Sequence, residues 1–128
     1  MTFDIYRTIA QSIVSVEDTM GSVAQVESSA FAQEVLESSE PVIVDFWAEW
    51  CAPCRMLGPV FERTSTKFDG KAKFVKVNVD ESPEISMQYG VTTIPNLLFF
   101  KGGQVVDQSV GYVSDAQLAA KVERVLGS

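Results

Sequence analysis

Residues 42–47, which read Val-Ile-Val-Asp-Phe-Trp, constrain the fold of this chain more than any other stretch. β-branched and aromatic side chains occupy both alternating positions, a pattern typical of a strand that is buried on both faces of a sheet. Both cysteines of the chain, Cys51 and Cys54, follow directly in the motif Trp-Cys-Ala-Pro-Cys. The sequence therefore predicts a central strand with a cysteine pair at its carboxyl end, where the next helix begins.

The remaining predicted elements alternate between strands and helices around this one. Gly102-Gly103 predicts a two-residue hairpin turn between the last two strands. The order β-α-β-α-β-α-β-β-α predicts an α/β fold in which a mixed central sheet is flanked by helices on both faces. In chain order we expect a strand over 23–26, a helix over 30–37 capped by Ser28 or Ser29, the strand over 42–47, a helix over 51–68, a strand over 72–79, a helix over 82–89 capped by Ser82, strands over 96–101 and 104–110, and a helix over 114–126.

Composition narrows the classes of function. A chain of 128 residues can bury a core without disulfide scaffolding. Its 10 basic and 17 acidic residues disfavour binding to nucleic acid or to an anionic membrane surface. Histidine is absent, which excludes an imidazole base and most transition-metal sites. No apolar stretch reaches the roughly 18–20 residues of a membrane-spanning helix, and the amino terminus does not read as a leader. We expect a protein of a reducing compartment, cytoplasmic or, if processed from a precursor, in an organelle interior.

Residues 1–21 are predicted to be an extension that precedes a folded domain over residues 22–128. Apolar side chains at positions 3, 6, 9, 13 and 16 recur at helical spacing, which indicates an amphipathic helix. Such a helix packs against its own domain, frays as a tail, or serves in docking. We expect a monomer, with self-association through residues 1–20 as the alternative.

The spacing of Cys51 and Cys54 favours redox chemistry. Two residues between cysteines at a helix start place both sulfurs on one turn, close enough to form a disulfide. The first amides and the dipole of the helix stabilise a thiolate on the earlier cysteine. Cys51 is therefore the expected nucleophile, and Cys54 is the expected thiol that resolves the mixed disulfide. Pro53 restricts the backbone between them.

Resolution requires an acceptor for the Cys54 proton, and Asp45 is the candidate. A carboxyl group in an otherwise apolar strand has a raised pKa and can exchange a proton near neutral pH. Lys76, in the middle of the next predicted strand, is its candidate charge partner. A hydrogen-bonded or edge-exposed Asp45 and an ordinary strand-face Lys76 are the alternatives.

Three other interpretations of the cysteines stay open. A zinc site needs about four ligands, so two thiols without histidine would require two chains that share one ion. A purely structural disulfide would close too short a loop to stabilise the fold much. Inert buried thiols are the third, although a helix start is an electropositive setting that favours reactivity.

Residues 44–54, Val-Asp-Phe-Trp-Ala-Glu-Trp-Cys-Ala-Pro-Cys, resemble the active-site segment of thioredoxins, and Thr93-Ile94-Pro95 resembles their substrate-binding turn. The resemblance extends over about residues 22–126, with the same order of elements. It implies the thioredoxin fold, with a cis peptide bond between Ile94 and Pro95. It also implies the roles already given to Cys51, Cys54, Asp45 and Lys76.

The same resemblance implies a substrate-binding surface around the cysteines. The Ile94 backbone would pair with an extended substrate chain, Trp47 would pack beside the site, and Gly90 and Val91 would lie near it. Gly111 also fits an ordinary turn glycine. Ala52 replaces the glycine usual in the family, so the redox potential and partner preference need measurement. The residues implied in substrate binding are Trp50, Ala52, Pro53, Ile94, Pro95, Gly111 and Tyr112.

These observations predict a thiol-disulfide oxidoreductase that reduces protein disulfides without a metal, flavin or nucleotide cofactor. Its partners would be disulfide-containing proteins and a thioredoxin reductase that regenerates the dithiol. A thiol oxidase or isomerase is the alternative within redox chemistry. A protein-binding module on the same fold is the alternative outside it.

Overall fold

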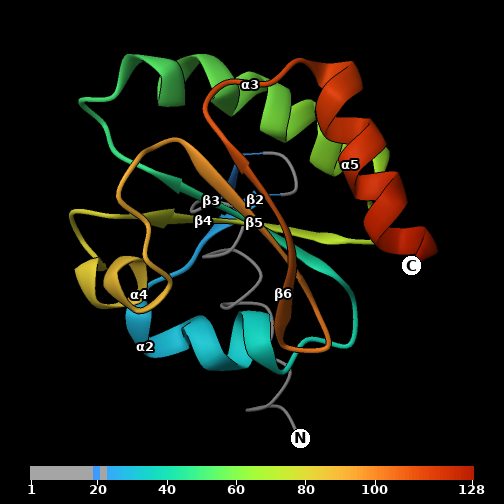
Figure 1. Ribbon diagram of the computed structural model, residues 1–128, viewed down its shortest axis with the longest axis horizontal. Coiled ribbons are helices and arrows are strands. Elements are labelled where there is room, and N and C mark those ends of the chain that lie inside the picture. Colours follow the sequence, from blue (N-terminus) through green and yellow to red (C-terminus); the bar gives the residue numbers. More distant parts are fainter. Residues whose placement is uncertain (1–18, 21–22) are drawn as a thin grey trace, which may run out of the picture.

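A computed structural model describes residues 19–20 and 23–128 and places one sheet between two layers of helices (Figure 1). The strand order is β1-β2-β4-β3-β5-β6. β2, β4 and β3 are parallel, whereas β5 and β6 continue the sheet in antiparallel pairing beyond β3. The predicted mixed sheet is therefore confirmed. The strands are β1 (Thr19–Met20), β2 (Val23–Gln25), β3 (Val42–Trp47), β4 (Lys73–Asn78), β5 (Asn96–Lys101) and β6 (Gln104–Val110).

Helices cover both faces of the sheet, as predicted. α3 and α5 lie on one face, and α2, the π-helical turn η1 and α4 lie on the other (Figure 1). Among residues 19–20 and 23–128, none of the helices combines the length and apolar character needed to cross a membrane. The bounds are α2 (Ser28–Phe31), η1 (Ala32–Leu36), α3 (Ala52–Lys67), α4 (Pro83–Gln88) and α5 (Asp115–Gly127).

The amino-terminal edge of the sheet differs from the predicted order. Residues 19 and 20, assigned to the extension by sequence, form β1 and pair antiparallel with β2. The amphipathic helix and the docking role predicted for the preceding residues lie outside the described part of the chain.

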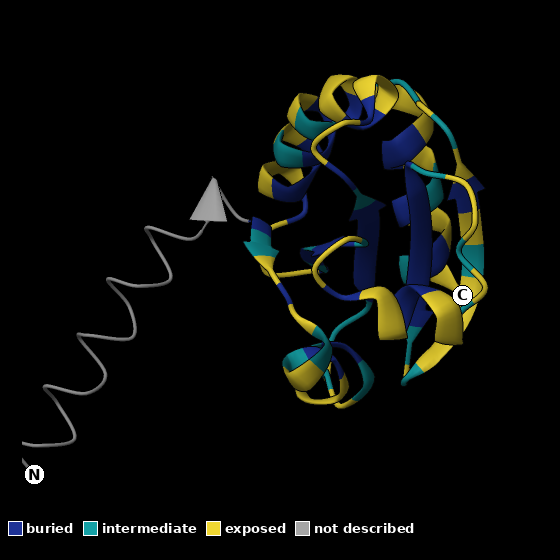
Figure 2. Cartoon of the chain, turned by 90° about the vertical axis from the view of Figure 1, so that its left-hand side faces the viewer, coloured by how far each residue is buried: buried dark blue, intermediate teal, exposed yellow. Residues whose placement is uncertain are grey.

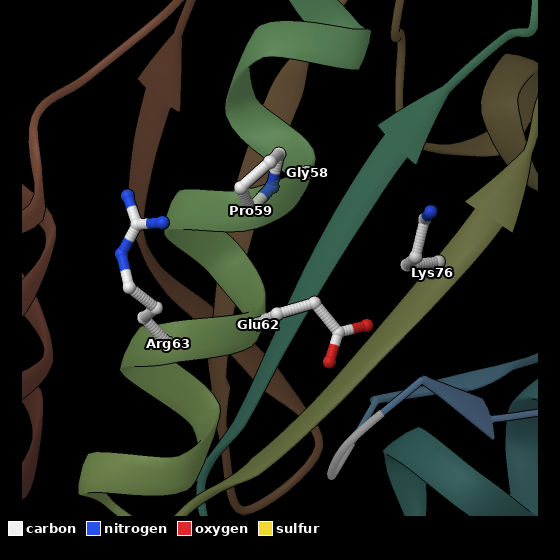
Figure 3. A pocket seen from close by; sticks show the side chains of 5 residues that line it. All are labelled: Gly58, Pro59, Glu62, Arg63 and Lys76. Carbon is white, nitrogen blue, oxygen red and sulfur yellow. The ribbon is translucent and has the colours of Figure 1, made fainter.

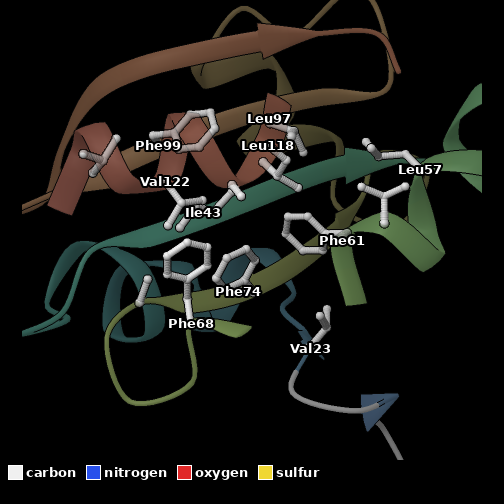
Figure 4. Packing of buried hydrophobic residues seen from close by; sticks show 14 residues of the cluster. Val23, Ile43, Leu57, Phe61, Phe68, Phe74, Leu97, Phe99, Leu118 and Val122 are labelled. Carbon is white, nitrogen blue, oxygen red and sulfur yellow. The ribbon is translucent and has the colours of Figure 1, made fainter. Parts of the chain in front are cut away.

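Alternate residues of β3 feed two separate cores. Ile43 packs into a cluster with α3 and α5 that includes Phe61, Phe74 and Leu118 (Figure 4). Val44 and its even-numbered neighbours pack into a second cluster against α2, η1 and α4. Figure 2 shows the strands at the centre as buried and the outer sides of the helices as exposed. Burial on both faces explains why residues 42–47 carry almost no polar side chain.

The predicted serine cap of α2 is wrong, whereas Ser82 occupies the predicted N-cap position of α4 without a side-chain hydrogen bond there. α2 begins at Ser28 after the N-cap residue Glu27, and neither α2 nor α4 receives a side-chain hydrogen bond at its N-cap. Instead the Ser28 amide donates to Ser82 Oγ at 3.1 Å, and the Ser28 hydroxyl donates to Glu84 Oε1 at 2.7 Å. The hydroxyl groups thus join α2 to α4, because a tertiary contact satisfies them in place of the local cap.

The hairpin between β5 and β6 forms as predicted. Gly102 and Gly103 have φ values of +60° and +79°, the left-handed region that a two-residue hairpin turn requires. A Cβ atom on Gly103 would also lie 2.9 Å from the Leu36 carbonyl oxygen. A larger residue is therefore disfavoured at Gly103 for two separate reasons, its positive φ and this contact.

Candidate active site

Strand register brings several loops to one end of the sheet. Trp47 at the end of β3 is paired with Asn78 at the end of β4. Asn96, the first residue of β5, lies between Phe46 of β3 and Val110 of β6. The loops after β3, β4 and β6 and the loop before β5 therefore meet at the carboxyl end of β3. In that order, these loops carry Cys51, Asp80, Gly111 with Tyr112, and Ile94 with Pro95.

Cys51 and Cys54 form a disulfide at the start of α3, with their Cα atoms 5.2 Å apart. Cys51 is the N-cap residue, and its Sγ accepts a hydrogen bond from the Cys54 amide at 3.2 Å. This position favours negative charge on Cys51 once the disulfide is reduced, because helix amides and the helix dipole point at the sulfur. The two residues are 5% and 3% exposed, whereas the intervening Ala52 and Pro53 are exposed. Ala52 and Pro53 therefore form the exposed surface next to the two sulfurs.

The loop before β5 lies directly beside the disulfide. The predicted cis peptide bond between Ile94 and Pro95 is confirmed. The Ile94 carbonyl oxygen lies 3.8 Å from Cys51 Sγ. The Pro95 carbonyl accepts a hydrogen bond from the Gly111 amide at 2.8 Å, and Gly111 has a φ of +91°. The backbone of the loop before β5 is thus held against the sulfur. Tyr112, which follows Gly111 in the sequence, is exposed.

Trp50 forms the exposed rim of the site. Its side chain is 69% exposed, and its indole nitrogen donates to Asp80 Oδ2 at 2.9 Å. Arg55 Nη1 donates to the Glu49 carbonyl at 2.7 Å and so fastens the same loop to α3. Sequence reasoning missed Asp80. Its position two residues after β4, the parallel neighbour of β3, was the signal that could have found it.

Asp45 is a buried and unpartnered carboxyl group. It is 1% exposed, and neither oxygen has a hydrogen-bond partner among the described residues. Burial raises the pKa of Asp45 to about 7, against the smaller lowering effect of the positive charge on Lys76. The expected raised pKa is confirmed, and Asp45 is neither edge-exposed nor hydrogen-bonded to another described residue.

Lys76 is the register neighbour of Asp45 but is not ion-paired with it. The two residues lie opposite each other in β4 and β3. Among the described residues no salt bridge joins them, and Lys76 Nζ instead lies 4.1 Å from the centroid of the Trp47 ring. This cation–π contact places the ammonium group beside a ring that also packs against the two cysteines. Lys76 therefore acts on Asp45 through its charge and not through a hydrogen bond.

The structure separates the predicted site residues into two groups. The cysteines, Trp50, Ala52, Pro53, Ile94, Pro95, Gly111 and Tyr112 lie on the loops at the end of β3, and Asp45 and Lys76 lie within the sheet. Val91 follows α4 and Gly90 and packs against the cluster on the α2 and α4 face.

Known proteins match this chain over most of its length. The family model named Thioredoxin matches residues 22–124. The chain is 51% identical over 107 residues to Thioredoxin 1 of Nostoc sp., an alignment that spans 84% of this chain and 100% of that protein. It is 49% identical to the thioredoxin of Synechocystis sp. over the same shares of both chains. It is also 40% identical to the chloroplastic M-type thioredoxin of Pisum sativum, over 89% of this chain and 66% of that protein.

Proposed function

This chain belongs to the thioredoxin family of thiol-disulfide oxidoreductases, and we propose how its residues divide the work of reducing protein disulfides. The proposal is carried by one observation: a cysteine pair at the start of α3 directly follows a strand that buries an unpartnered carboxyl group. The pair supplies two electrons by dithiol–disulfide exchange. The carboxyl group supplies a proton acceptor that titrates near neutral pH.

In the first step, the Cys51 thiolate attacks one sulfur of the target disulfide. A bond forms between Cys51 Sγ and that sulfur, and the second target sulfur leaves as a thiolate that takes a proton from solvent. The helix start stabilises the attacking thiolate, because the Cys54 amide already donates to Cys51 Sγ.

In the second step, Cys54 resolves the mixed disulfide. The Cys54 thiol transfers its proton to the Asp45 carboxylate, and the resulting thiolate attacks Cys51 Sγ. The Cys51–Cys54 disulfide present in the structure forms, and the remaining target thiolate leaves. The target gains two electrons, and the protein loses two. A reductase returns the pair to the dithiol.

The surface around the disulfide would bind the target. Ala52, Pro53, Trp50 and Tyr112 are exposed around two nearly buried sulfurs. The Ile94 carbonyl beside Cys51 would accept a backbone hydrogen bond from an extended target segment. Gly111 would hold the loop in place through its bond to Pro95.

As a family member, the protein works with disulfide-containing targets and a reductase. We further propose that it acts as a monomer in a reducing compartment, the cytoplasm or an organelle interior. The net charge of −7 supports protein partners over nucleic acid or anionic lipid.

The test is reduction of a purified disulfide-bonded protein by the full chain, with and without the substitution Cys51→Ser. We expect turnover by the native protein and none by the variant. Undiminished turnover by Cys51→Ser would contradict the mechanism. A reduction potential of about −120 mV, at the oxidising end of the range for such pairs, would instead support a thiol oxidase.

A further inference from the structure

A cavity of about 400 Å³ opens between α3 and β4. Gly58, Pro59, Glu62, Arg63 and Lys76 line it (Figure 3). Glu62 extends from α3 toward β3 and β4, whereas Arg63 points the other way (Figure 3). The Arg63 guanidinium binds both oxygens of Asp115 at 2.9 and 3.0 Å. The charged side chains that remain for the cavity are therefore Glu62 and Lys76.

Asp45 lies on the same side of the sheet as this cavity. Ile43 of β3 and Phe74 of β4 both pack beneath α3 and α5. Side chains two positions further along a strand face the same way, so Asp45 and Lys76 also face α3. Lys76 thus borders the cavity on one side and is the register neighbour of Asp45 on the other.

Lys76 acts on two carboxyl groups at once. Burial raises the pKa of both Asp45 and Glu62, and the Lys76 charge opposes this rise in each case. The charged groups of β3, β4 and α3 at this place are these two acids, Lys76 and Arg63, whose guanidinium is bound to Asp115. The Lys76 ammonium is held on the Trp47 ring and makes no ion pair with either acid among the described residues. The positive charge of Lys76 therefore acts both on the buried carboxyl group of Asp45 and on the carboxyl group of Glu62 at the cavity wall.

A sealed acid that takes a proton in each turnover must also release it. Asp45 is 1% exposed and has no hydrogen-bond partner through which a proton could leave. We propose that Glu62 is the outer member of a proton pathway that runs from Asp45 past Lys76 and opens to solvent through this cavity. The inference rests on the role proposed above for Asp45.

The proton balance of this pathway is simple. After Cys54 has given its proton to Asp45, the neutral Asp45 passes that proton through cavity water to the Glu62 carboxylate, which releases it to solvent. Asp45 is then a carboxylate again and ready for the next turnover. The positive charge of Lys76 stabilises whichever acid carries the negative charge. Glu62 is thus a positioning residue that never contacts the target.

Electrostatics determines in which direction the pKa of Asp45 should change when Glu62 is replaced. In Glu62→Gln the carboxylate that competes with Asp45 for the positive charge of Lys76 disappears. This change favours ionised Asp45, so its titration midpoint should move down by roughly half a unit. Glu62→Asp keeps the charge and should stay closer to the native midpoint. Glu123→Gln makes the same change on the exposed side of α5 and should leave the midpoint in place.

The experiment is a carbon-detected NMR titration of the Asp45 carboxyl group in the full oxidised chain and these three variants. The pH dependence of mixed-disulfide release should move in the same direction as the Asp45 midpoint. A Glu62→Gln midpoint equal to the native one, or an equal shift in Glu123→Gln, would overturn the pathway. Release by Asp45→Asn at the native rate would instead overturn the proposed role of Asp45, so the two failures are distinguishable.

Discussion

β3 presents two faces that differ in chemistry although they alternate along six residues. Val44 and Phe46 face α2 and α4 and are fully buried among apolar side chains. Asp45 and Trp47 face α3, and both bury polar atoms that lack hydrogen-bond partners among the described residues. The first face carries only apolar side chains that stabilise the fold, while the second carries buried polar atoms that cost stability and, in the mechanism proposed above, support proton exchange. The stability gained on the apolar face therefore offsets the cost of burying the polar atoms of Asp45 and Trp47. We call the face of β3 toward α3 the reactive face.

The largest effect should come from Phe46→Ala on the apolar face. Phe46 is 0% exposed, so truncation removes buried surface and leaves a cavity. We expect a loss of about 3 to 5 kcal/mol in the free energy of unfolding at every pH. Denaturant unfolding measures the loss. Stopped-flow kinetics on the folded variant should show mixed-disulfide release with its native pH dependence. An altered pH dependence would contradict the assignment of stability and proton exchange to separate faces of β3.

Asp45→Asn should have the opposite effect on stability, and only at higher pH. The folded-state pKa of about 7 lies above the ordinary value of 3.8, so ionisation of Asp45 destabilises the folded state. This cost is absent well below pH 3.8, grows between pH 3.8 and 7, and is complete above pH 7, at on the order of 4 kcal/mol. Relative to the variant, the native protein should therefore lose stability as pH rises. Parallel unfolding curves of the two proteins across pH 3–8 would refute the buried, unpartnered state of Asp45.

Lys76→Met tests whether the charge of Lys76 acts on Asp45 within the reactive face. It removes the charge that lowers the Asp45 pKa, so the Asp45 midpoint should rise above about 7, by roughly one unit. Carboxyl NMR titration measures this shift, which has the opposite sign to that of Glu62→Gln. Lys71→Met, an exposed lysine in the turn before β4, is the matched control. An unchanged midpoint in Lys76→Met would show that Lys76 does not act on Asp45.

The smallest effect should come from Ser114→Ala at the start of α5. Ser114 and Gln117 form a capping box, with hydrogen bonds of 3.2 and 2.9 Å, on a helix that covers the reactive face. Its loss should lower stability by about 1 kcal/mol. Thermal unfolding measures this loss. Slower mixed-disulfide release in Ser114→Ala would show that stability and chemistry are not separable on this side of the sheet.

Much of the fold was predictable because local patterns and tertiary packing agree. The β-branched and aromatic run over residues 42–47 and the glycines at the β5–β6 turn matched the observed strands closely. The side-chain caps predicted at Ser28 and Ser82 are absent because these two residues bond to each other across two helices, and a local pattern cannot show a partner 54 residues away. The cap predicted at Ser114 is confirmed. β1 was missed for a similar reason, since two residues form a strand only through their neighbour β2.

The candidate site was predictable where chemistry depends on spacing along the chain. Cys51, Cys54 and the buried Asp45 follow from one strand and the helix after it. Asp80 and Glu62 were not found, because Asp80 meets Trp50 through strand register and Glu62 borders the cavity through the packing of α3 on β4. The position of Asp80 just after β4 was a signal that could have been read, whereas the spacing of residues along α3 gave no signal for Glu62.

Trapping the covalent intermediate with Cys54→Ser tests most directly whether Cys51 attacks the target and Cys54 resolves the adduct. This variant keeps the nucleophile but removes the thiol that resolves the adduct, so a disulfide-bonded target should accumulate on the protein. Peptide mapping by mass spectrometry should find the target cysteine bonded to Cys51. Accumulation of an adduct on Cys54 in Cys51→Ser, with none on Cys51 in Cys54→Ser, would contradict the assigned order of attack.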